Sequence, residues 1–551
     1  MKKYIFFLLI IFSFASCNFS YLVSKNQKVA LITKSENNVL INNKVPEMED
    51  GKTLLPRDGD PHQITVARPG YKTDYKVCMP YKYGAAAICT GIGNFTLFGV
   101  LPAVVAPQTI LPCLALGGGV SALTIWNKDR YYDMKFWDYD SEIIVGSDMM
   151  KYPVKDSTMK QIRLNKLSVN VSPEKTSVKI IKYGDYKDGR MTSFYKDIKK
   201  EENIIAQNST LTSELNKVLA IGGFIDTTSK VLNNGYKSNL LLEGTIVGYT
   251  SNFVPPIVNR TKLNWVGLKA EQSPILGFLK ITTETKWDVL DIYKNVIYSD
   301  TIVAESGEFV AYEESSNSKY SENAIKDAQE TSLLLLMKKA KFTTEAKLPI
   351  ESKSALDTII IPISKNYVVD LEQAVASTVT IKTKDGHGSG FLISETGHII
   401  TNYHVVTDTN HLEAIFNEGE RFKIKVLRVN KEADLALVKI EANTLLPFKV
   451  TDDEHYNIGN EIFAIGTPSA LDLRQTISKG IISSVRKNND GNKYIQTDAS
   501  VNGGNSGGPL IDENGVLFGV VNAKLVGSGV EGIAFGIPAS DITKKLNIKF
   551  K

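Results

Sequence analysis

The hydrophobic residues of this 551-residue chain begin with a continuous apolar run, Tyr4–Phe14. Two lysines (Lys2-Lys3) precede the run, and the small residues Ala15-Ser16 follow it. A helix that spans a bilayer permanently needs about 20 apolar residues, so this run is too short to be one. Positive residues, a short apolar run and small residues, in this order, predict a secretory signal peptide.

A second apolar pattern covers residues 83–127, which include no charged residue. The stretch is rich in Gly, Ala, Leu and Val, and Pro102, Pro107 and Pro112 interrupt its centre. Two apolar spans around a proline-broken turn predict a membrane hairpin. A Gly-rich segment buried in the core of a soluble domain fits the same pattern, so both interpretations remain open.

Strand and helix patterns alternate in residues 128–345, which predicts an α+β domain. Asn239–Tyr249 and Ile275–Thr283 are expected to be strands, and Ser321 to begin a helix. One face of this helix is apolar, formed by Ala324, Ile325, Ala328, Leu335 and Leu336. Lysines 338, 339 and 341 are expected near its end, where cations complement the helix dipole. Without a phosphate loop or a metal-ligand cluster, this domain is expected to bind or position rather than catalyse.

Short strands separated by turns fill two other regions of the chain. In residues 17–82, strand patterns at Val39–Ile41 and Ile64–Val66 predict a small β-rich module. In residues 371–551, strands at Phe422–Val429, Ile462–Ile465 and Val516–Val521 predict an all-β domain that ends in a helix, Ser540–Leu546. A polar, lysine-rich stretch at 346–370 is expected to link this domain to the α+β domain.

Composition narrows the class of protein without naming a function. Hydrophobic residues make up 43% and charged residues 23% of the chain, values typical of globular proteins with about three or four domains at this length. The 64 basic and 60 acidic residues nearly balance, so nothing indicates a nucleic-acid partner. The four cysteines are too few for a disulfide scaffold, and all of them precede residue 114.

With Cys17 directly after the small pair, the N-terminal segment resembles a bacterial lipoprotein signal. The resemblance implies that residues 1–16 are removed, that Cys17 carries the lipid, and that the protein lies in the bacterial cell envelope on the periplasmic or extracellular face. An ordinary signal peptide with a chance cysteine is the alternative. The β-rich module is weakly similar to PEGA-type surface modules around Pro69-Gly70-Tyr71.

The chemistry-bearing patterns all lie in the C-terminal region, which also holds five of the six histidines. The first pattern is Gly388-Ser-Gly-Phe-Leu-Ile-Ser followed by Gly397-His-Ile-Ile-Thr-Asn-Tyr-His404. The second is Ala433-Asp434-Leu-Ala-Leu-Val, and the third is Gly503-Gly-Asn-Ser506-Gly-Gly-Pro. A serine hydroxyl becomes nucleophilic beside a base, and the base needs an acid that fixes its tautomer.

These motifs, in the order His404, Asp434, Ser506, resemble a trypsin-like (chymotrypsin-fold) serine protease of the HtrA/Deg type. The resemblance implies a C-terminal double β-barrel over residues 371–551, with His404 as base, Asp434 as its orienting acid and Ser506 as nucleophile. It also implies an oxyanion hole made by backbone N–H groups of Gly504, Asn505 and Ser506.

The same resemblance suggests a substrate pocket. The position that is acidic in trypsin-type enzymes selective for Arg or Lys corresponds to Ser500, with Val501 and Ala523 as neighbours. An uncharged pocket is therefore expected, one that takes a small or medium apolar residue. Asp498 is interpreted as structural. No role is expected for the four other histidines of this region, His387, His398, His411 and His455.

Together these predictions describe a lipid-anchored envelope serine endopeptidase that acts on polypeptides and needs no cofactor or metal. Membrane contacts are expected through lipid at Cys17 and, if they form a hairpin, through residues 83–127. HtrA proteins usually carry a PDZ domain after the protease, and none is expected here, which puts HtrA-style cage assembly in doubt. A protease-like binding protein with an idle site is the alternative function, and the oligomeric state is left open.

Overall fold

The computed structural model describes a defined part of the 551 residues. The described residues are 26–56, 61–82, 134–136, 142–172, 176–183, 193–198, 208–225, 235–254, 261–262, 271–272, 276–312, 319–349, 357–408, 411–454, 456–488, 490–522 and 532–551. Cys17 and the apolar stretch at 83–127 lie outside these residues, so their predicted roles stay predictions. In the described part of the chain, the helices are all too short or too polar to cross a bilayer.

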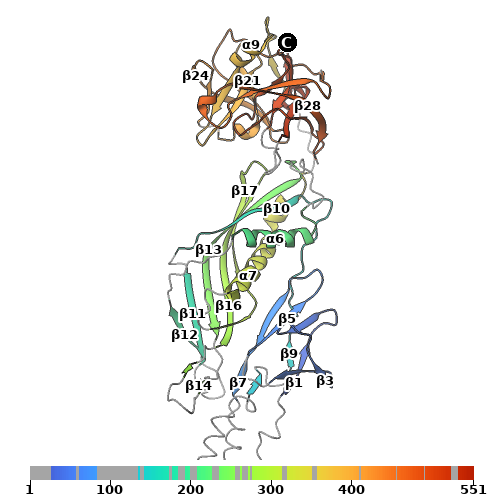
Figure 1. Cartoon of the computed structure of the whole chain (residues 1–551), viewed down its shortest axis with the longest axis vertical. Helices are drawn as coiled ribbons and strands as arrows, with labels where there is room; N and C mark the ends of the chain where they lie inside the picture. The colour runs from blue at the N-terminus through green and yellow to red at the C-terminus, as the bar shows by residue number, and fades with distance from the viewer. Residues whose placement is uncertain are drawn as a thin grey trace, which may run out of the picture.

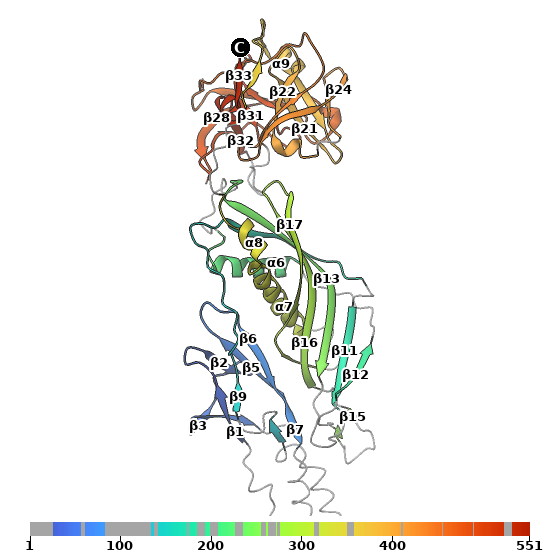
Figure 2. The same cartoon turned by 180° about the vertical axis from the view of Figure 1, so that it is seen from behind.

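The molecule has three regions, of which the third lies at one end of the long axis and the first lies beside part of the second (Figure 1, Figure 2). The first is a β-rich module with two small sheets, ordered β3-β4-β1-β9 and β2-β5-β6, and a separate β7-β8 pair. Because β9 pairs with β1 and β8 with β7, strands beyond residue 128 complete this module instead of belonging to the next domain. Its strands are β1 (Asn26–Ile32), β2 (Asn38–Ile41), β3 (Met48–Glu49), β4 (Lys52–Pro56), β5 (His62–Ala67), β6 (Asp74–Cys78), β7 (Pro80–Lys82), β8 (Met134–Phe136) and β9 (Glu142–Ile144).

The second region is an α+β domain built on a seven-stranded sheet with the path β12-β11-β13-β16-β17, in which β10 also pairs with β13 and β18 with β16. Buried and less buried positions alternate along β13, as expected for a strand with one face on a core. The elements are β10 (Gln161–Val169), β11 (Thr176–Tyr183), β12 (Ser193–Ile198), α6 (Asn208–Ile221), β13 (Asn239–Val254), β14 (Thr261–Lys262), β15 (Glu271–Gln272), β16 (Leu276–Leu290), β17 (Val296–Glu305), β18 (Phe309–Tyr312), α7 (Lys319–Met337) and α8 (Ala340–Glu345).

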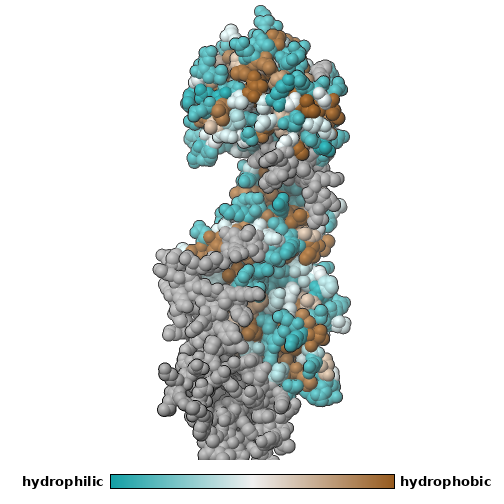
Figure 3. Space-filling model, viewed as in Figure 1, coloured by the Kyte–Doolittle hydropathy of each residue, from teal (hydrophilic) through white to brown (hydrophobic). Residues whose placement is uncertain are grey.

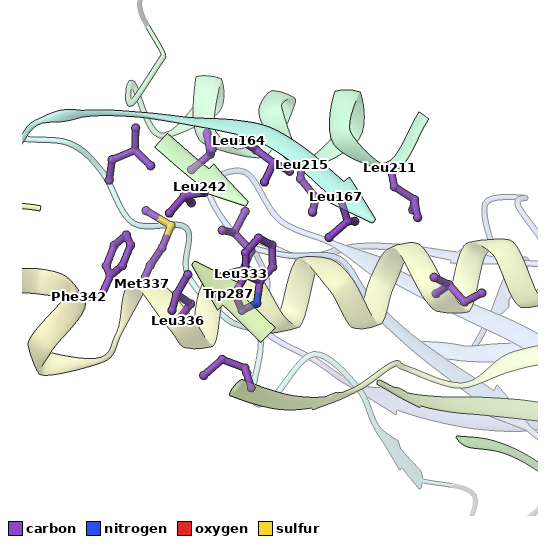
Figure 4. Packing of buried hydrophobic residues seen from close by; sticks show 14 of the residues in the cluster. Leu164, Leu167, Leu211, Leu215, Leu242, Trp287, Leu333, Leu336, Met337 and Phe342 are labelled. Carbon is purple, nitrogen blue, oxygen red and sulfur yellow. The ribbon is translucent and has the colours of Figure 1, made fainter. Parts of the chain in front are cut away.

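The core of this domain lies between the sheet and helices α6 and α7 (Figure 4). Leu211 and Leu215 of α6 and Leu333 of α7 are buried around the fully buried Trp287 of β16. The indole N–H of Trp287 donates to the hydroxyl of Ser332 at 2.9 Å, so its single polar group is satisfied inside the core. The predicted apolar face of α7 is confirmed, but α7 ends at Met337 and the expected lysines follow its end.

The third region is a C-terminal β domain with two lobes. One lobe is a seven-stranded, half-barrel sheet of order β24-β23-β20-β21-β22-β26-β25, and the other is a closed barrel, β27-β28-β29-β32-β31-β30. The expected double barrel is thus one closed barrel and one half-barrel. The face in Figure 3 carries small hydrophobic patches among hydrophilic residues.

The first lobe contains β20 (Thr378–Lys382), β21 (His387–Leu392), β22 (His398–Thr401), the 3-10 helix η6 (Tyr403–Val405), β23 (Glu413–Ile415), β24 (Arg421–Lys423), β25 (Lys425–Asn430) and β26 (Leu435–Lys439). The second contains β27 (Glu461–Gly466), η7 (Leu471–Leu473), β28 (Thr476–Lys487), β29 (Lys493–Thr497), β30 (Pro509–Ile511), β31 (Leu517–Val521) and β32 (Ala534–Pro538). Around them lie β19 (Ile359–Ile361), α9 (Leu371–Ala376), α10 (Ser540–Leu546) and β33 (Ile548–Phe550).

The stretch at 346–370 is not wholly a free linker. Its strand β19 pairs in parallel with β33 at the other end of the domain. This pairing fixes residues 359–361 to the C-terminal domain, and Ile361 is fully buried there. The local sequence is polar around three isoleucines, so only the pairing with a distant strand reveals the element.

Candidate active site

His404 and Asp434 meet at the edge of the first lobe. His404 lies in η6, which follows β22, and Asp434 directly precedes β26, the strand that pairs with β22. The Nδ1 of His404 lies 2.7 Å from Oδ2 of Asp434, and the backbone N–H of His404 donates to Oδ1 at 3.0 Å. Because a carboxylate only accepts, Nδ1 carries the proton and leaves the Nε2 lone pair free to accept one.

Asp434 is held by more than the histidine. Its side chain is 3% exposed, and its backbone adopts the left-handed conformation with φ of 55°. Aspartate tolerates this conformation better than most residues, but it still costs free energy. The Nδ2 of Asn522 donates to Oδ2 at 3.0 Å, and the Nδ2 of Asn402 donates to the Asp434 carbonyl at 2.9 Å. These contacts fix the carboxylate in one orientation.

Ser506 follows a tight turn formed by residues 502–505. The N–H of Asn505 donates to the carbonyl of Asn502 at 3.1 Å, and Gly504 has φ of 101°, the arrangement of a type II turn with glycine at its third position. A β-carbon on Gly504 would overlap the carbonyl oxygen of Thr467. Glycine is therefore required at 504 for both conformation and space. The N–H of Asn505 is engaged in the turn, so its predicted role in an oxyanion hole does not fit this geometry.

Ser389 joins the serine loop to the first lobe. Its N–H donates to the carbonyl of Ser506 at 2.8 Å, and its hydroxyl donates to the carbonyl of Gly504, also at 2.8 Å. The same hydroxyl accepts the N–H of Thr467 at 3.1 Å. Ser389 is completely buried. It lies in the first sequence motif, but its partners are far away in the chain, so its role was not predicted.

His404 and Ser506 line one depression of about 470 Å³. Its other walls are the loop of residues 383–387, parts of 405–408, and Gly503 and Gly504. His387, for which no role was expected, lies in this wall, and its Nε2 lies 2.9 Å from the carbonyl of Thr467. Because a carbonyl only accepts, His387 donates this bond and fastens the loop beside the serine.

The residues predicted for the substrate pocket, where described, differ in their surroundings. Ser500 is exposed and its carbonyl accepts the hydroxyl of Ser478 at 2.7 Å, while Val501 packs against the buried cluster of the closed barrel. Ala523 lies outside the described residues. Asp498 accepts the N–H of Ile481 at 2.7 Å, which fits the structural interpretation.

Of the remaining histidines of this domain, the two that the structure describes, His398 and His411, do not line this depression. His398 lies 2.7 Å from the hydroxyl of Ser394, and burial lowers its pKa, with a smaller effect of nearby Lys439. His411 is an exposed residue near Asp408. His455 lies outside the described residues.

The C-terminal domain is similar in sequence to known proteins. Residues 388–520 match the family described as Trypsin-like peptidase domain. The chain is 38% identical over 157 residues to the probable periplasmic serine endoprotease DegP-like of Chlamydia trachomatis, covering 28% of this chain and 31% of that protein. It is 36% identical over 188 residues to the chloroplastic protease Do-like 1 of Arabidopsis thaliana, covering 32% and 42%.

A crystal structure of the serine endoprotease from Yersinia pestis aligns with 34% of this chain and 68% of its own, with 32% identity and a TM-score of 0.28. The chain spans less than half the length of the two curated relatives named above. The C-terminal region therefore has a trypsin-like β-barrel protease fold and is similar in sequence to DegP-like and Do-like serine proteases. The relatives cover no more than a third of the chain, so they leave the first two regions unaccounted for.

Proposed function

We propose that this protein is a serine endopeptidase of the bacterial cell envelope whose triad is His404, Asp434 and Ser506. The observation that carries the proposal is the buried carboxylate of Asp434, 2.7 Å from Nδ1 of a histidine that shares a depression with the serine. The family match over residues 388–520 and the curated serine proteases among the relatives support the same class.

The reaction follows from the arrangement. Ser506 Oγ attacks the carbonyl carbon of the peptide bond while Nε2 of His404 takes its proton, and Asp434 stabilises the imidazolium that forms. The negative charge moves to the carbonyl oxygen, for which we propose the N–H groups of Gly504 and Ser506 as donors. His404 then gives its proton to the leaving amine, and water hydrolyses the acyl-enzyme.

The substrate preference that we propose is an uncharged one. Ser500 takes the position that is acidic in enzymes selective for Arg or Lys, and Val501 is the apolar neighbour. A library of peptide substrates with varied residues on the acyl side of the cut tests this. Faster cleavage after Val or Ala than after Arg supports the proposal, and the reverse order contradicts it.

A fluorophosphonate probe tests the class directly, because it phosphonylates only a serine that a nearby base activates. We expect the purified chain to be labelled and Ser506→Ala to remain unlabelled. Ser484→Ala, which removes another serine of the C-terminal domain, serves as the matched control and keeps the labelling. Absence of labelling in well-folded wild-type protein would favour the alternative, a protease-like binding protein with an idle site.

The location is a separate proposal that rests on Cys17 and on the periplasmic relatives. We propose that lipid on Cys17 holds the protein in the envelope, with the regions before the protease positioning it or its substrates. In cell fractions washed with salt, the wild type is expected in the membrane and Cys17→Ala in the soluble fraction. If the variant stays in the membrane, residues 83–127 are the better candidate for the anchor.

A further inference from the structure

The tip of the hairpin between β16 and β17, in the α+β domain, contacts the catalytic histidine of the C-terminal domain. The ring of Tyr293 is stacked on the imidazole of His404, with ring centres 6.0 Å apart and planes inclined by 15°. It meets Tyr403 edge-on at 5.3 Å, and its hydroxyl donates to the carbonyl of Lys431 at 2.9 Å. In both views this hairpin reaches toward the C-terminal domain (Figure 1, Figure 2).

The hairpin tip is rigid because a buried carboxylate organises it. Asp291 accepts the N–H groups of Tyr293 and Asn295, at 2.8 and 2.9 Å, and the side-chain amide of Asn295 at 2.8 Å. Lys294 takes the left-handed conformation with φ of 69° that the turn requires. Asp291 itself is 5% exposed. The ring of Tyr293 is thus presented in one orientation.

A second segment of the α+β domain supports the contact. Tyr236 also stacks on Tyr293, with ring centres 5.8 Å apart and planes inclined by 21°. The next residue, Lys237, pairs with Glu432 at 2.9 Å, and its backbone N–H donates to Asp490 at 2.9 Å. Two segments of one domain therefore meet the loop that precedes Asp434.

The contact does not contribute to the depression that Ser506 lines. The depression that holds His404 and Ser506 is lined by residues 383–408 and 503–506, with no contribution from the α+β domain among the described residues. Tyr293 therefore covers a part of the imidazole that does not face this depression. Burial, and after it the charge of Asp434, raises the pKa of the Tyr293 phenol, which keeps its hydroxyl protonated as a donor.

We propose that Tyr293 is a positioning residue for His404, so that docking of the α+β domain sets the base of the triad. This inference rests on the proposed function. A ring against the imidazole limits its rotation and keeps water from the bond between His404 and Asp434. A displacement of a catalytic group by about 1 Å can lower the reaction rate by about a hundredfold. Loss of this ring should therefore slow the chemical step, because the imidazole of His404 would be displaced.

Three variants of the full chain test the proposal. Tyr293→Ala removes the ring, Tyr293→Phe keeps it without the hydroxyl, and Lys294→Gly changes an exposed neighbour at a φ that glycine favours. The readouts are the rate of labelling by a fluorophosphonate probe, and kcat and KM on dye-labelled casein. We expect Tyr293→Ala to lower the labelling rate and kcat by about ten- to a hundredfold with KM unchanged. Tyr293→Phe should regain most of the loss, and Lys294→Gly should match the wild type.

Each other result overturns the inference. Equal labelling of Tyr293→Ala and wild type would show that the ring does not position the base. Faster labelling would show that Tyr293 blocks the site, and a raised KM with kcat unchanged would show that it forms part of the substrate site. Thermal unfolding of each variant controls for loss of fold.

A readout that needs no catalysis separates this inference from the proposed function. The proton on Nδ1 of His404 gives a low-field signal in a proton NMR spectrum, assigned by its loss in His404→Ala. We expect the signal in wild type and Tyr293→Phe, and its broadening in Tyr293→Ala through exchange with water. If the wild type is not labelled at all, the proposed function fails. An unchanged signal in Tyr293→Ala overturns the positioning role in either case.

Discussion

At the scale of single residues, the carboxylate of Asp434 contacts His404 through both of its oxygens. One oxygen accepts the backbone N–H of His404 and the other accepts the ring proton. In Asp434→Asn, the amide would present an N–H group to Nδ1, which favours the tautomer with the proton on Nε2. That tautomer cannot accept the proton of Ser506. We expect kcat to fall by about 10⁴-fold while the fold remains, measured with dye-labelled casein and by circular dichroism.

The matched control for this prediction is Asp498→Asn. Asp498 accepts a backbone N–H in the same domain without contacting the triad, so its substitution should leave kcat within about threefold of wild type. A variant Asp434→Asn with wild-type kcat would exclude Asp434 as the residue that orients His404.

Ser389 gives a second prediction at this scale. Ser389→Ala removes the hydroxyl that bonds both Gly504 and Thr467, which leaves buried polar groups without that partner. We expect a loss of about 1–3 kcal/mol in stability, and a lower kcat because the turn before Ser506 loosens. Ser394→Ala removes another buried hydroxyl, which contacts His398, and should reduce stability without lowering kcat. Denaturant unfolding and casein cleavage together separate the two effects.

The sequence singled out His404, Asp434 and Ser506 because each lies in a short local motif. It did not predict the residues that fix them, since those contacts join distant parts of the chain. Asn522 reaches Asp434 across 88 positions, and Ser389 reaches Gly504 across 115. Nothing in the local pattern around an asparagine or a serine states which partner the fold will bring to it. Asn505 was assigned a role by resemblance alone, and the turn uses its N–H instead.

At the scale of elements, periodicity predicted well wherever one element buries one face. The strand at 239–249 is confirmed within the longer β13, the strand at 275–283 is confirmed from Leu276 onward in β16, and the helix at 540–546 is confirmed as α10. The expected strand at 422–429 is divided into β24 and β25, since Arg421–Lys423 pairs with β23 whereas Lys425–Asn430 pairs with β26. Strand partners are set by the fold, so a hydrophobic pattern cannot show where a chain changes partner.

Helix α7 carries the buried Asp327 and the half-buried Glu330 against the N-terminal module, and these carboxylates give a prediction about pH. Glu330 accepts the hydroxyl of Tyr152 at 2.6 Å, and burial raises its pKa above the ordinary 4.5 despite that bond. Burial likewise raises the pKa of Asp327, although it pairs with Lys72. A folded state that holds a proton more tightly than the unfolded state is favoured at low pH. This contribution is therefore complete below about pH 4.5 and is lost as pH rises through the folded pKa.

Glu330→Gln removes the titration and keeps an oxygen that can accept from Tyr152. We expect its unfolding free energy at pH 7 to rise by about 1 kcal/mol, and the wild-type decrease between pH 4.5 and pH 7 to become smaller. Thermal unfolding over this range measures both. Glu322→Gln, an exposed position in the first turn of α7, is the control. Equal pH dependence in wild type and Glu330→Gln would exclude Glu330 as the source.

At the scale of the whole molecule, the C-terminal domain is not independent of the region before it. Tyr293 contacts Lys431 across 138 positions, and it does so beside His404. From the sequence, the α+β domain was expected to bind or to position, because it contains no catalytic pattern. The sequence could not show that Tyr293 contacts the C-terminal domain, since a tyrosine in a hairpin turn has the same local pattern whether it faces solvent or another domain.

The ion pair between Lys237 and Glu432 tests that dependence from outside the aromatic contact. The two side chains are 28% and 43% exposed, so the pair should contribute less than about 1 kcal/mol to stability. We expect the pair to act mainly on how the α+β domain is oriented against the C-terminal domain. Reversing one charge in Glu432→Lys places two cations together beside the loop that carries Asp434. We expect slower labelling of Ser506 by a fluorophosphonate, by about three- to tenfold at low salt, and a smaller decrease at high salt because ions screen the repulsion.

Adding Lys237→Glu restores the attraction with its direction reversed, so the double variant should recover most of the wild-type labelling rate. Recovery is specific to the pair, because independent effects of two substitutions would add instead of cancelling. Glu413→Lys reverses a comparable exposed pair with Arg421 in the same domain and should change nothing. If the double variant is as slow as Glu432→Lys, the added charge acts on the triad directly and docking through Lys237 does not set the catalytic base.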